Sequence, residues 1–217
     1  MKFKDIKSTY TEEKKISDFN NHLFLFYTYR PISFLITHLF LRLKISANTV
    51  TYFTFIFGPI LIMTLFMENF IGSLIAFFSS ILFYTFDCVD GNMARIKRKD
   101  SRFGEFLDSF SGITFSFFVH LFFSLKSMDQ QFWIQLIPIT SFSFILISRY
   151  YSLRFLKNNN YTSYKFSLKT IMKSFPDLYP FLILMTFYIS EYSIIFLVGG
   201  YNFLALVYII NKTLKTT

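Results

Sequence analysis

The segment DCVDGNMARIKRKDSRFGEFLDSFSG, residues 87–112, joins two long apolar runs and decides how the chain folds. Each run approaches the roughly 20 residues that an α-helix needs to cross a bilayer, so the segment predicts a hairpin of two transmembrane helices. Asp87 and Asp90 are three residues apart and share one helix face, and Asp108 lies at the start of the second run. Three carboxylates are therefore expected where two helices meet a basic loop.

Composition supports a membrane protein. The chain has 217 residues, of which 53% are hydrophobic, 22% are aromatic and 16% are charged. An average soluble domain is about one quarter charged, and it lacks repeated apolar runs of spanning length. We therefore predict one polytopic, all-α membrane domain. Cys88 is the single cysteine, so an intramolecular disulfide is excluded.

The apolar runs predict six transmembrane helices behind a polar and basic N-terminal segment. The N-terminal segment, residues 1–47, is expected to be cytoplasmic and to carry a helix along the membrane surface over 31–43. Residues 48–217 are expected to form the six-helix domain. The boundary between the last two spans stays open between Glu191 and Gly199-Gly200. The expected spans are 50–67, 70–86, 103–125, 132–151, 177–190 and 192–211.

Basic residues predict the orientation. With six spans and a cytoplasmic N-terminus, every Lys and Arg except Lys126 falls on the cytoplasmic side. The carboxylates would then face the cytoplasm, and we expect the protein in the plasma (inner) membrane. A basic rim beside anionic lipid also accounts for the net charge of +9, so no nucleic-acid partner is expected.

The residues around the carboxylates predict a metal and a phosphate. Three carboxylates without nearby Cys or His favour a hard cation, Mg²⁺ or Mn²⁺. Magnesium is usually bound by one or two carboxylates together with substrate phosphates. Gly91 and Ala94 leave room for a ligand or a neighbouring helix, and the Arg95 guanidinium suits a phosphate. A phosphate-bearing substrate is therefore predicted.

These residues resemble the signature of the class I CDP-alcohol phosphatidyltransferase family. The signature reads Asp, two residues, Asp-Gly, two residues, Ala-Arg, eight residues, Gly, three residues, Asp, three residues, Asp. Residues 46–51 also resemble the Thr-Pro-Asn-x-x-Thr start of that family's first span, with Ser and Ala in place of Thr and Pro. The signature positions present in this chain are Asp87, Asp90, Gly91, Ala94, Arg95, Gly104 and Asp108.

The resemblance implies a reaction, a cofactor and roles for these residues. It implies transfer of a substituted phosphate from a CDP-alcohol, such as CDP-diacylglycerol, to an acceptor hydroxyl with release of CMP, in phospholipid synthesis. The partners are then a CDP-linked alcohol or lipid and membrane lipids, and a homodimer is allowed because the family often dimerises. By position, metal would be held by Asp87, Asp90 and Asp108, the nucleotide by Asn48, Gly91, Ala94, Arg95, Ser101 and Gly104, and the acceptor by Arg149 and Arg154.

One position departs from the family pattern. Gly112 stands where the family has the fourth aspartate, which is taken as the base that deprotonates the acceptor. Glu105 shares a helix face with Asp108 but lies nearer the loop, so it is a poor replacement. Three functions stay open: an active transferase, a scaffold that binds CDP-lipid without turnover, and a small transporter or lipid-handling membrane protein with a coincidental motif. The acceptor could be glycerol phosphate, serine, inositol phosphate, an amino alcohol or a sugar. The sequence also leaves open whether CDP carries the lipid or the head group.

Overall fold

The computed structural model describes residues 3–67, 69–97, 102–127, 132–155, 163–188 and 191–214, and this part of the chain is helical with no strand. The predicted all-α class is thus confirmed. In chain order the elements are α1 (Phe3–Ser8), α2 (Glu12–Asn21), η1 (Leu25–Tyr29), α3 (Arg30–Arg42), α4 (Ala47–Met63), η2 (Thr64–Phe66), α5 (Phe70–Lys97), α6 (Arg102–Lys126), α7 (Phe132–Phe155), α8 (Leu168–Lys173), η3 (Phe175–Leu178), α9 (Tyr179–Met185) and α10 (Glu191–Leu214).

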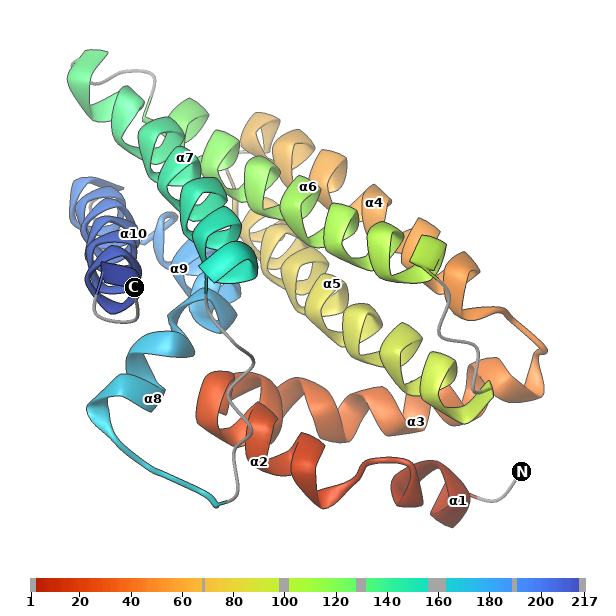
Figure 1. The fold of residues 1–217 in the computed structure, drawn as a ribbon. Coiled ribbons are helices and arrows are strands. Elements are labelled where there is room, and N and C mark those ends of the chain that lie inside the picture. The colour runs from red at the N-terminus through yellow and green to blue at the C-terminus, as the bar shows by residue number, and fades with distance from the viewer. Residues whose placement is uncertain are drawn as a thin grey trace.

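Helices α4, α5 and α6 run side by side and carry the predicted signature (Figure 1). Ser46 caps α4 by accepting a hydrogen bond from the backbone N–H of Thr49, as expected for a helix-starting serine. A Cβ on Gly58 of α4 would clash with the Phe118 ring of α6, so the glycine lets α4 approach α6 closely. The Phe83 and Phe115 rings of α5 and α6 stack with centroids 3.8 Å apart.

The C-terminal third packs α10 against α7, with α9 beside α5 (Figure 1). Gly199 and Gly200 lie inside α10, so the turn before the last helix is not at this pair. A Cβ on Gly199 would lie 2.5 Å from Cγ2 of Ile137, which explains a glycine where two helices touch. Helix α7 continues through Pro138.

Among the residues that the structure describes, four helices are long and apolar enough to cross a membrane: Ala47–Phe66, Phe70–Lys97, Arg102–Lys126 and Ser193–Asn211. Phe132–Ser148 and Phe175–Met185 are apolar but shorter. The predicted count of six is therefore not confirmed. The difference is clearest for 177–190, where a 3₁₀ turn precedes a short helix that ends at Met185. Proline lies in the first turn of both pieces, where it favours a new helix start over a continuous span.

The N-terminal helices lie across the end of α5 that carries the aspartates (Figure 1). Helix α3 agrees with the helix predicted over 31–43 and is amphipathic. Its buried side includes Ser33 and Thr37, whereas Ile32, Leu35 and Leu39 are exposed. A position along the membrane surface remains a prediction.

Candidate active site

Asp87 and Asp90 lie on one face of α5, which continues without a break through both residues to Lys97. The shared helix face predicted for Asp87 and Asp90 is therefore present, and the helix extends beyond the expected span of 70–86. Asp90 is only 5% exposed. Its Oδ2 accepts a hydrogen bond of 2.7 Å from the hydroxyl of Thr51 on α4. A buried carboxylate is unfavourable without such a donor, so Thr51 stabilises and orients Asp90.

The third predicted metal ligand reaches the same region from α6. Asp108 is exposed near the start of that helix, and its carboxyl interacts electrostatically with those of Asp87 and Asp90. The structure thus brings the three carboxylates together. Among the described residues, however, no group of three or more His, Cys, Asp or Glu is already arranged to hold an ion. The three carboxylates are therefore neighbours, but their oxygen atoms do not converge on one point where an ion could bind.

The predicted nucleotide-binding residues lie around the same end of the bundle. Asn48, Gly91, Ala94, Arg95 and Gly104 are partly exposed, at the start of α4, on the last turns of α5 and at the start of α6. Ser101 lies outside the described residues, and the side chains of Arg149 and Arg154 on α7 do as well.

The Arg95 side chain turns back over its own helix. A Cβ on Gly91 would lie 3.5 Å from Nη1 of Arg95, an ordinary van der Waals contact. Arg95 Nη2 donates a hydrogen bond of 2.7 Å to Oδ1 of Asn92, whereas its buried Nε has no hydrogen-bond partner within the described structure. The guanidinium is therefore fixed on one side and retains donors for an anion.

Gly112 lies on α6 one turn beyond Asp108 and is partly exposed. Glu105, the weak candidate for a replacement carboxylate, is exposed in the first turn of α6. His120 is buried: its Nδ1 lies 2.7 Å from the carbonyl of Ser116, and its Nε2 lies 3.2 Å from the amide of Asn202. These contacts give His120 a structural role in the packing of α6.

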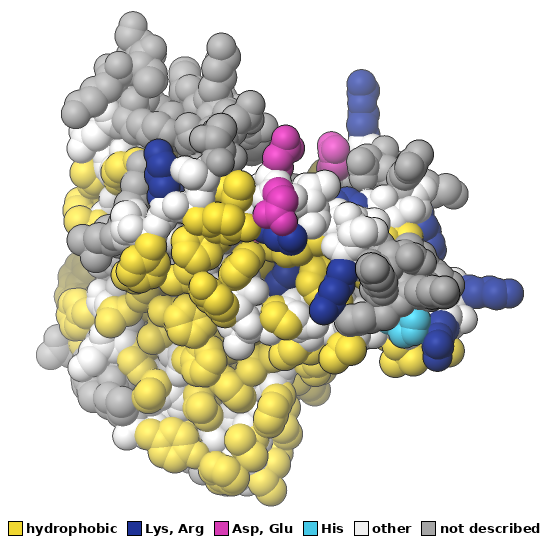
Figure 2. Space-filling view, turned by 90° about the horizontal axis from the view of Figure 1, so that it is seen from below, with side chains coloured by type: hydrophobic (Ala, Val, Ile, Leu, Met, Phe, Trp, Pro, Cys, Tyr) yellow, Lys and Arg dark blue, Asp and Glu magenta, His cyan; other side chains and the backbone are white. Residues whose placement is uncertain are grey.

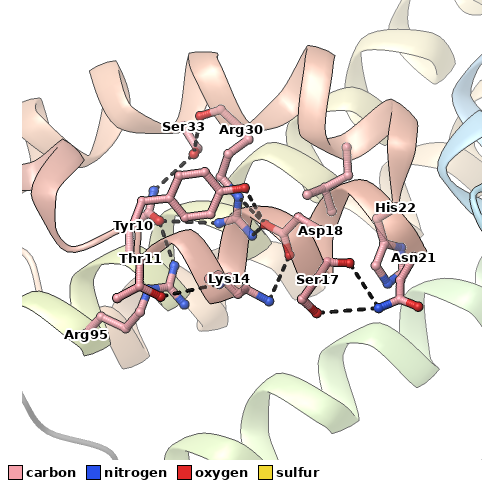
Figure 3. Close-up of polar contacts among 12 residues, drawn as sticks. Tyr10, Thr11, Lys14, Ser17, Asp18, Asn21, His22, Arg30, Ser33 and Arg95 are labelled. Atoms are coloured by element: carbon pink, nitrogen blue, oxygen red, sulfur yellow. Dashed lines mark hydrogen bonds and ion pairs between the residues drawn. The ribbon is translucent and has the colours of Figure 1, made fainter. Parts of the chain in front are cut away.

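Sequence reasoning missed the polar residues that hold the N-terminal helices against α5. Asp18 of α2, Arg30 of α3 and Asn92 of α5 are buried and hydrogen-bonded to one another in a chain, and Figure 3 shows Asp18 and Arg30 in it. Asp18 and Arg30 are 12 positions apart. Side-chain pairs of this kind follow no helical period, so no local pattern marked them.

Loss of the Thr51 hydroxyl is expected to weaken metal binding. We expect Thr51→Val to raise the Mn²⁺ concentration needed for half-saturation about tenfold, because groups that orient metal ligands typically contribute that much. Titration of the paramagnetic resonance signal of free Mn²⁺ measures the change. Thr54→Val is the matched control, since Thr54 is equally buried on α4 but donates to a backbone carbonyl. Equal effects of the two substitutions would contradict a specific role for Thr51.

A contact between His22 and Asp177 joins the N-terminal segment to η3, and its strength is expected to depend on pH. His22 Nδ1 lies 3.2 Å from Oδ1 of Asp177. The His22 side chain is 48% exposed, and partial loss of hydration beside η3 lowers the pKa of its imidazole, but the hydrogen bond and charge of Asp177 raise it by more, so this pKa lies above its ordinary value of 6.5. Because the folded-state pKa is raised, the stabilisation is complete below about 6.5 and is lost as pH rises through the folded-state value.

We therefore expect the melting temperature of the native protein to fall as pH rises above about 6.5, and to fall less in His22→Gln. Differential scanning fluorimetry in detergent measures both profiles. His38→Gln serves as the control, since His38 lies on α3 away from this pair. A profile for His22→Gln that parallels the native one would rule out this titration as the cause.

Residues 44–209 match the sequence model of CDP-alcohol phosphatidyltransferases, which covers most of the chain and both motifs. Neither the curated proteins nor the solved structures include a significant match. A match of this length excludes coincidence of a short motif, which removes the transporter alternative. The chain that places Asp87, Asp90 and Asp108 together at the ends of α5 and α6 belongs to the CDP-alcohol phosphatidyltransferase family.

Proposed function

We propose that the protein transfers a substituted phosphate from a CDP-alcohol, such as CDP-diacylglycerol, to an acceptor hydroxyl in phospholipid synthesis. The family acts on CDP-alcohols, and the observation that carries the proposal is the meeting of three carboxylates from α5 and α6 within the matched residues. The acceptor oxygen would bond to the phosphorus that bears the alcohol. The pyrophosphate P–O bond would break, and CMP would leave.

The carboxylates suit a divalent metal by the chemistry of their donor atoms. Asp87, Asp90 and Asp108 offer only oxygen ligands, and Asp90 is buried and oriented by Thr51. Oxygen ligands favour Mg²⁺ or Mn²⁺. When bound, such an ion would neutralise charge on the pyrophosphate. The protein itself would orient Asp90 from α4 and bring Asp108 to α5 from α6.

The nucleotide would lie beside the same carboxylates. We assign it Asn48, Gly91, Ala94, Arg95, Ser101 and Gly104 from the family signature. Arg95 has the strongest structural support, because its buried Nε is a donor without an acceptor among the described residues. Such a donor is costly to leave unpaired, and a phosphate oxygen would satisfy it. Arg149 and Arg154 remain proposed acceptor-binding residues on signature and position alone.

We further propose that this end of the bundle faces the cytoplasm of the plasma (inner) membrane. Figure 2 shows Lys and Arg side chains near acidic ones on the face seen from below, beside a broad hydrophobic area. Helix α3 would lie in the lipid interface, with exposed Ile32, Leu35 and Leu39 toward the acyl chains. Residues 1–47 would then be a cytoplasmic cover on a membrane domain formed by 48–217.

Gly112 favours a second candidate, a scaffold that binds CDP-lipid and metal without turnover. Glycine has no side chain to accept a proton, and loss of a general base typically reduces rates about 10² to 10⁴-fold. We prefer the active enzyme because the carboxylates and Arg95 are retained. In that case the acceptor proton would go to water or to the acceptor's own phosphate.

The test is CMP release by purified protein in lipid nanodiscs containing CDP-diacylglycerol. Glycerol phosphate, serine, inositol phosphate, an amino alcohol and a sugar are offered separately, and phosphorus NMR identifies the product. We expect CMP with at least one acceptor. Binding of CDP-diacylglycerol without CMP from any acceptor would favour the scaffold instead.

A further inference from the structure

A buried polar cluster connects the N-terminal helices to the signature-bearing helix, and Figure 3 shows it between α2 and α3. We call Asp18, Arg30, Asn92 and Arg95 the Asp18 cluster. Asp18 is 2%, Arg30 is 6% and Asn92 is 1% exposed. Asp18 and Arg30 precede residues 44–209, the part that matches the family, whereas the other two lie within it. The cluster therefore joins an N-terminal segment outside the family match to the signature itself.

The orientation of the Asn92 amide is set by α3. Its Nδ2 donates to Oγ of Ser33 at 3.0 Å and lies 3.3 Å from Oγ1 of Thr37. Its Oδ1 is thereby turned to the opposite side, where it accepts from Nη1 of Arg30 at 3.3 Å and from Nη2 of Arg95 at 2.7 Å. One amide oxygen thus holds two guanidinium groups next to each other.

Two neighbouring guanidinium groups repel unless one is neutralised, and Asp18 supplies the negative charge. Its Oδ2 accepts from Nε and Nη2 of Arg30 at 3.0 and 2.6 Å, and from the Tyr10 hydroxyl at 2.9 Å. Lys14 Nζ lies 2.9 Å from Oδ1. Burial would raise the pKa of Asp18, but Arg30 and Lys14 lower it by more, so this pKa is below its ordinary value and the group is ionised at neutral pH.

We propose that Asp18 and Arg30 are positioning residues that hold the Arg95 guanidinium where it meets the pyrophosphate of a CDP-alcohol; this inference rests on the proposed function. Arg95 is anchored to the cluster through Nη2 and keeps its buried Nε unpaired within the described structure. Neutralising Asp18 leaves the Arg30 charge uncompensated beside Arg95. Repulsion from Arg30 then displaces the Arg95 guanidinium, although no residue of the carboxylate site has changed.

The experiment is a double-mutant cycle on the full-length protein in nanodiscs with Mn²⁺, with the dissociation constant of CDP-diacylglycerol as the readout. We expect Asp18→Asn to weaken binding about tenfold, within the range for residues of one hydrogen-bond network. We expect Arg95→Gln to weaken binding similarly, and Asp18→Asn to have no further effect in the Arg95→Gln background. A purely structural role for Asp18 would give additive losses instead.

Two controls separate positioning from folding. Phe34→Leu weakens packing in the same buried region of α3 and should lower the melting temperature without changing the dissociation constant. If Asp18→Asn does not fold, Arg30→Lys replaces it in the cycle, since it keeps the charge but loses the planar fork of donors. Additive losses would overturn the inference and leave the proposed function standing. Absence of any CDP-diacylglycerol binding by the native protein would overturn the proposed function and the inference with it.

Discussion

Substitution of Asp108 by asparagine is expected to reduce CMP release on the order of 10³-fold, as removal of a group that stabilises transition-state charge does. Asp108 is exposed on α6, so the change should not disturb the packed core. Its carboxyl interacts with those of Asp87 and Asp90, and the change removes one of three negative charges from the proposed metal site. Initial rates of CMP formation at saturating Mn²⁺ measure the loss.

The matched control is Glu105→Gln. Glu105 is also an exposed carboxylate on α6, one turn before Asp108, so its substitution changes the net charge equally. We expect at most a small change in rate. If the two variants lost activity to the same extent, the general negative potential of this surface would explain the result, and a specific role for Asp108 would be excluded.

Removal of divalent metal is expected to have an equally large effect. EDTA should abolish CMP release, and Mg²⁺ or Mn²⁺ should restore it, because the proposed ligands are all carboxylate oxygens. Rates measured while Mn²⁺ is added back to EDTA-treated protein follow the recovery. CMP release that persisted in EDTA would contradict the assignment of Asp87, Asp90 and Asp108 as metal ligands.

Local sequence patterns predicted the first three long helices well. An unbroken apolar run followed by Asp87 and Asp90 predicted one helix through both residues, and α5 extends to Lys97. Ser46 marked the start of α4, where it makes a capping hydrogen bond. Capping residues, the spacing of apolar residues and the length of an apolar run all act within a few turns of one helix. They can therefore be recognised in the sequence without knowing which helices lie next to it.

Contacts between distant segments were not predictable in this way. Thr51 and Asp90 are 39 positions apart in the sequence, and their hydrogen bond joins α4 to α5. The sequence placed Thr51 in a family motif but did not show that it orients Asp90. Asp18 and Arg30 looked like ordinary charges of a polar N-terminal segment, yet both are buried. The short length of α9 was not predictable from the apolar run either. A proline in the first turn of η3 and another in the first turn of α9 each favour a new helix start, and apolar length alone does not indicate this.

The most direct test compares CMP release by the native protein and by Gly112→Asp in the same nanodiscs, with CDP-diacylglycerol, Mn²⁺ and the full set of acceptors. If the three carboxylates of α5 and α6 and the Asp18 cluster support phosphatidyl transfer, the native protein releases CMP above the level of Asp108→Asn. CMP release by Gly112→Asp alone, with none from the native protein, would contradict that account and show a binding protein that has lost its catalytic base.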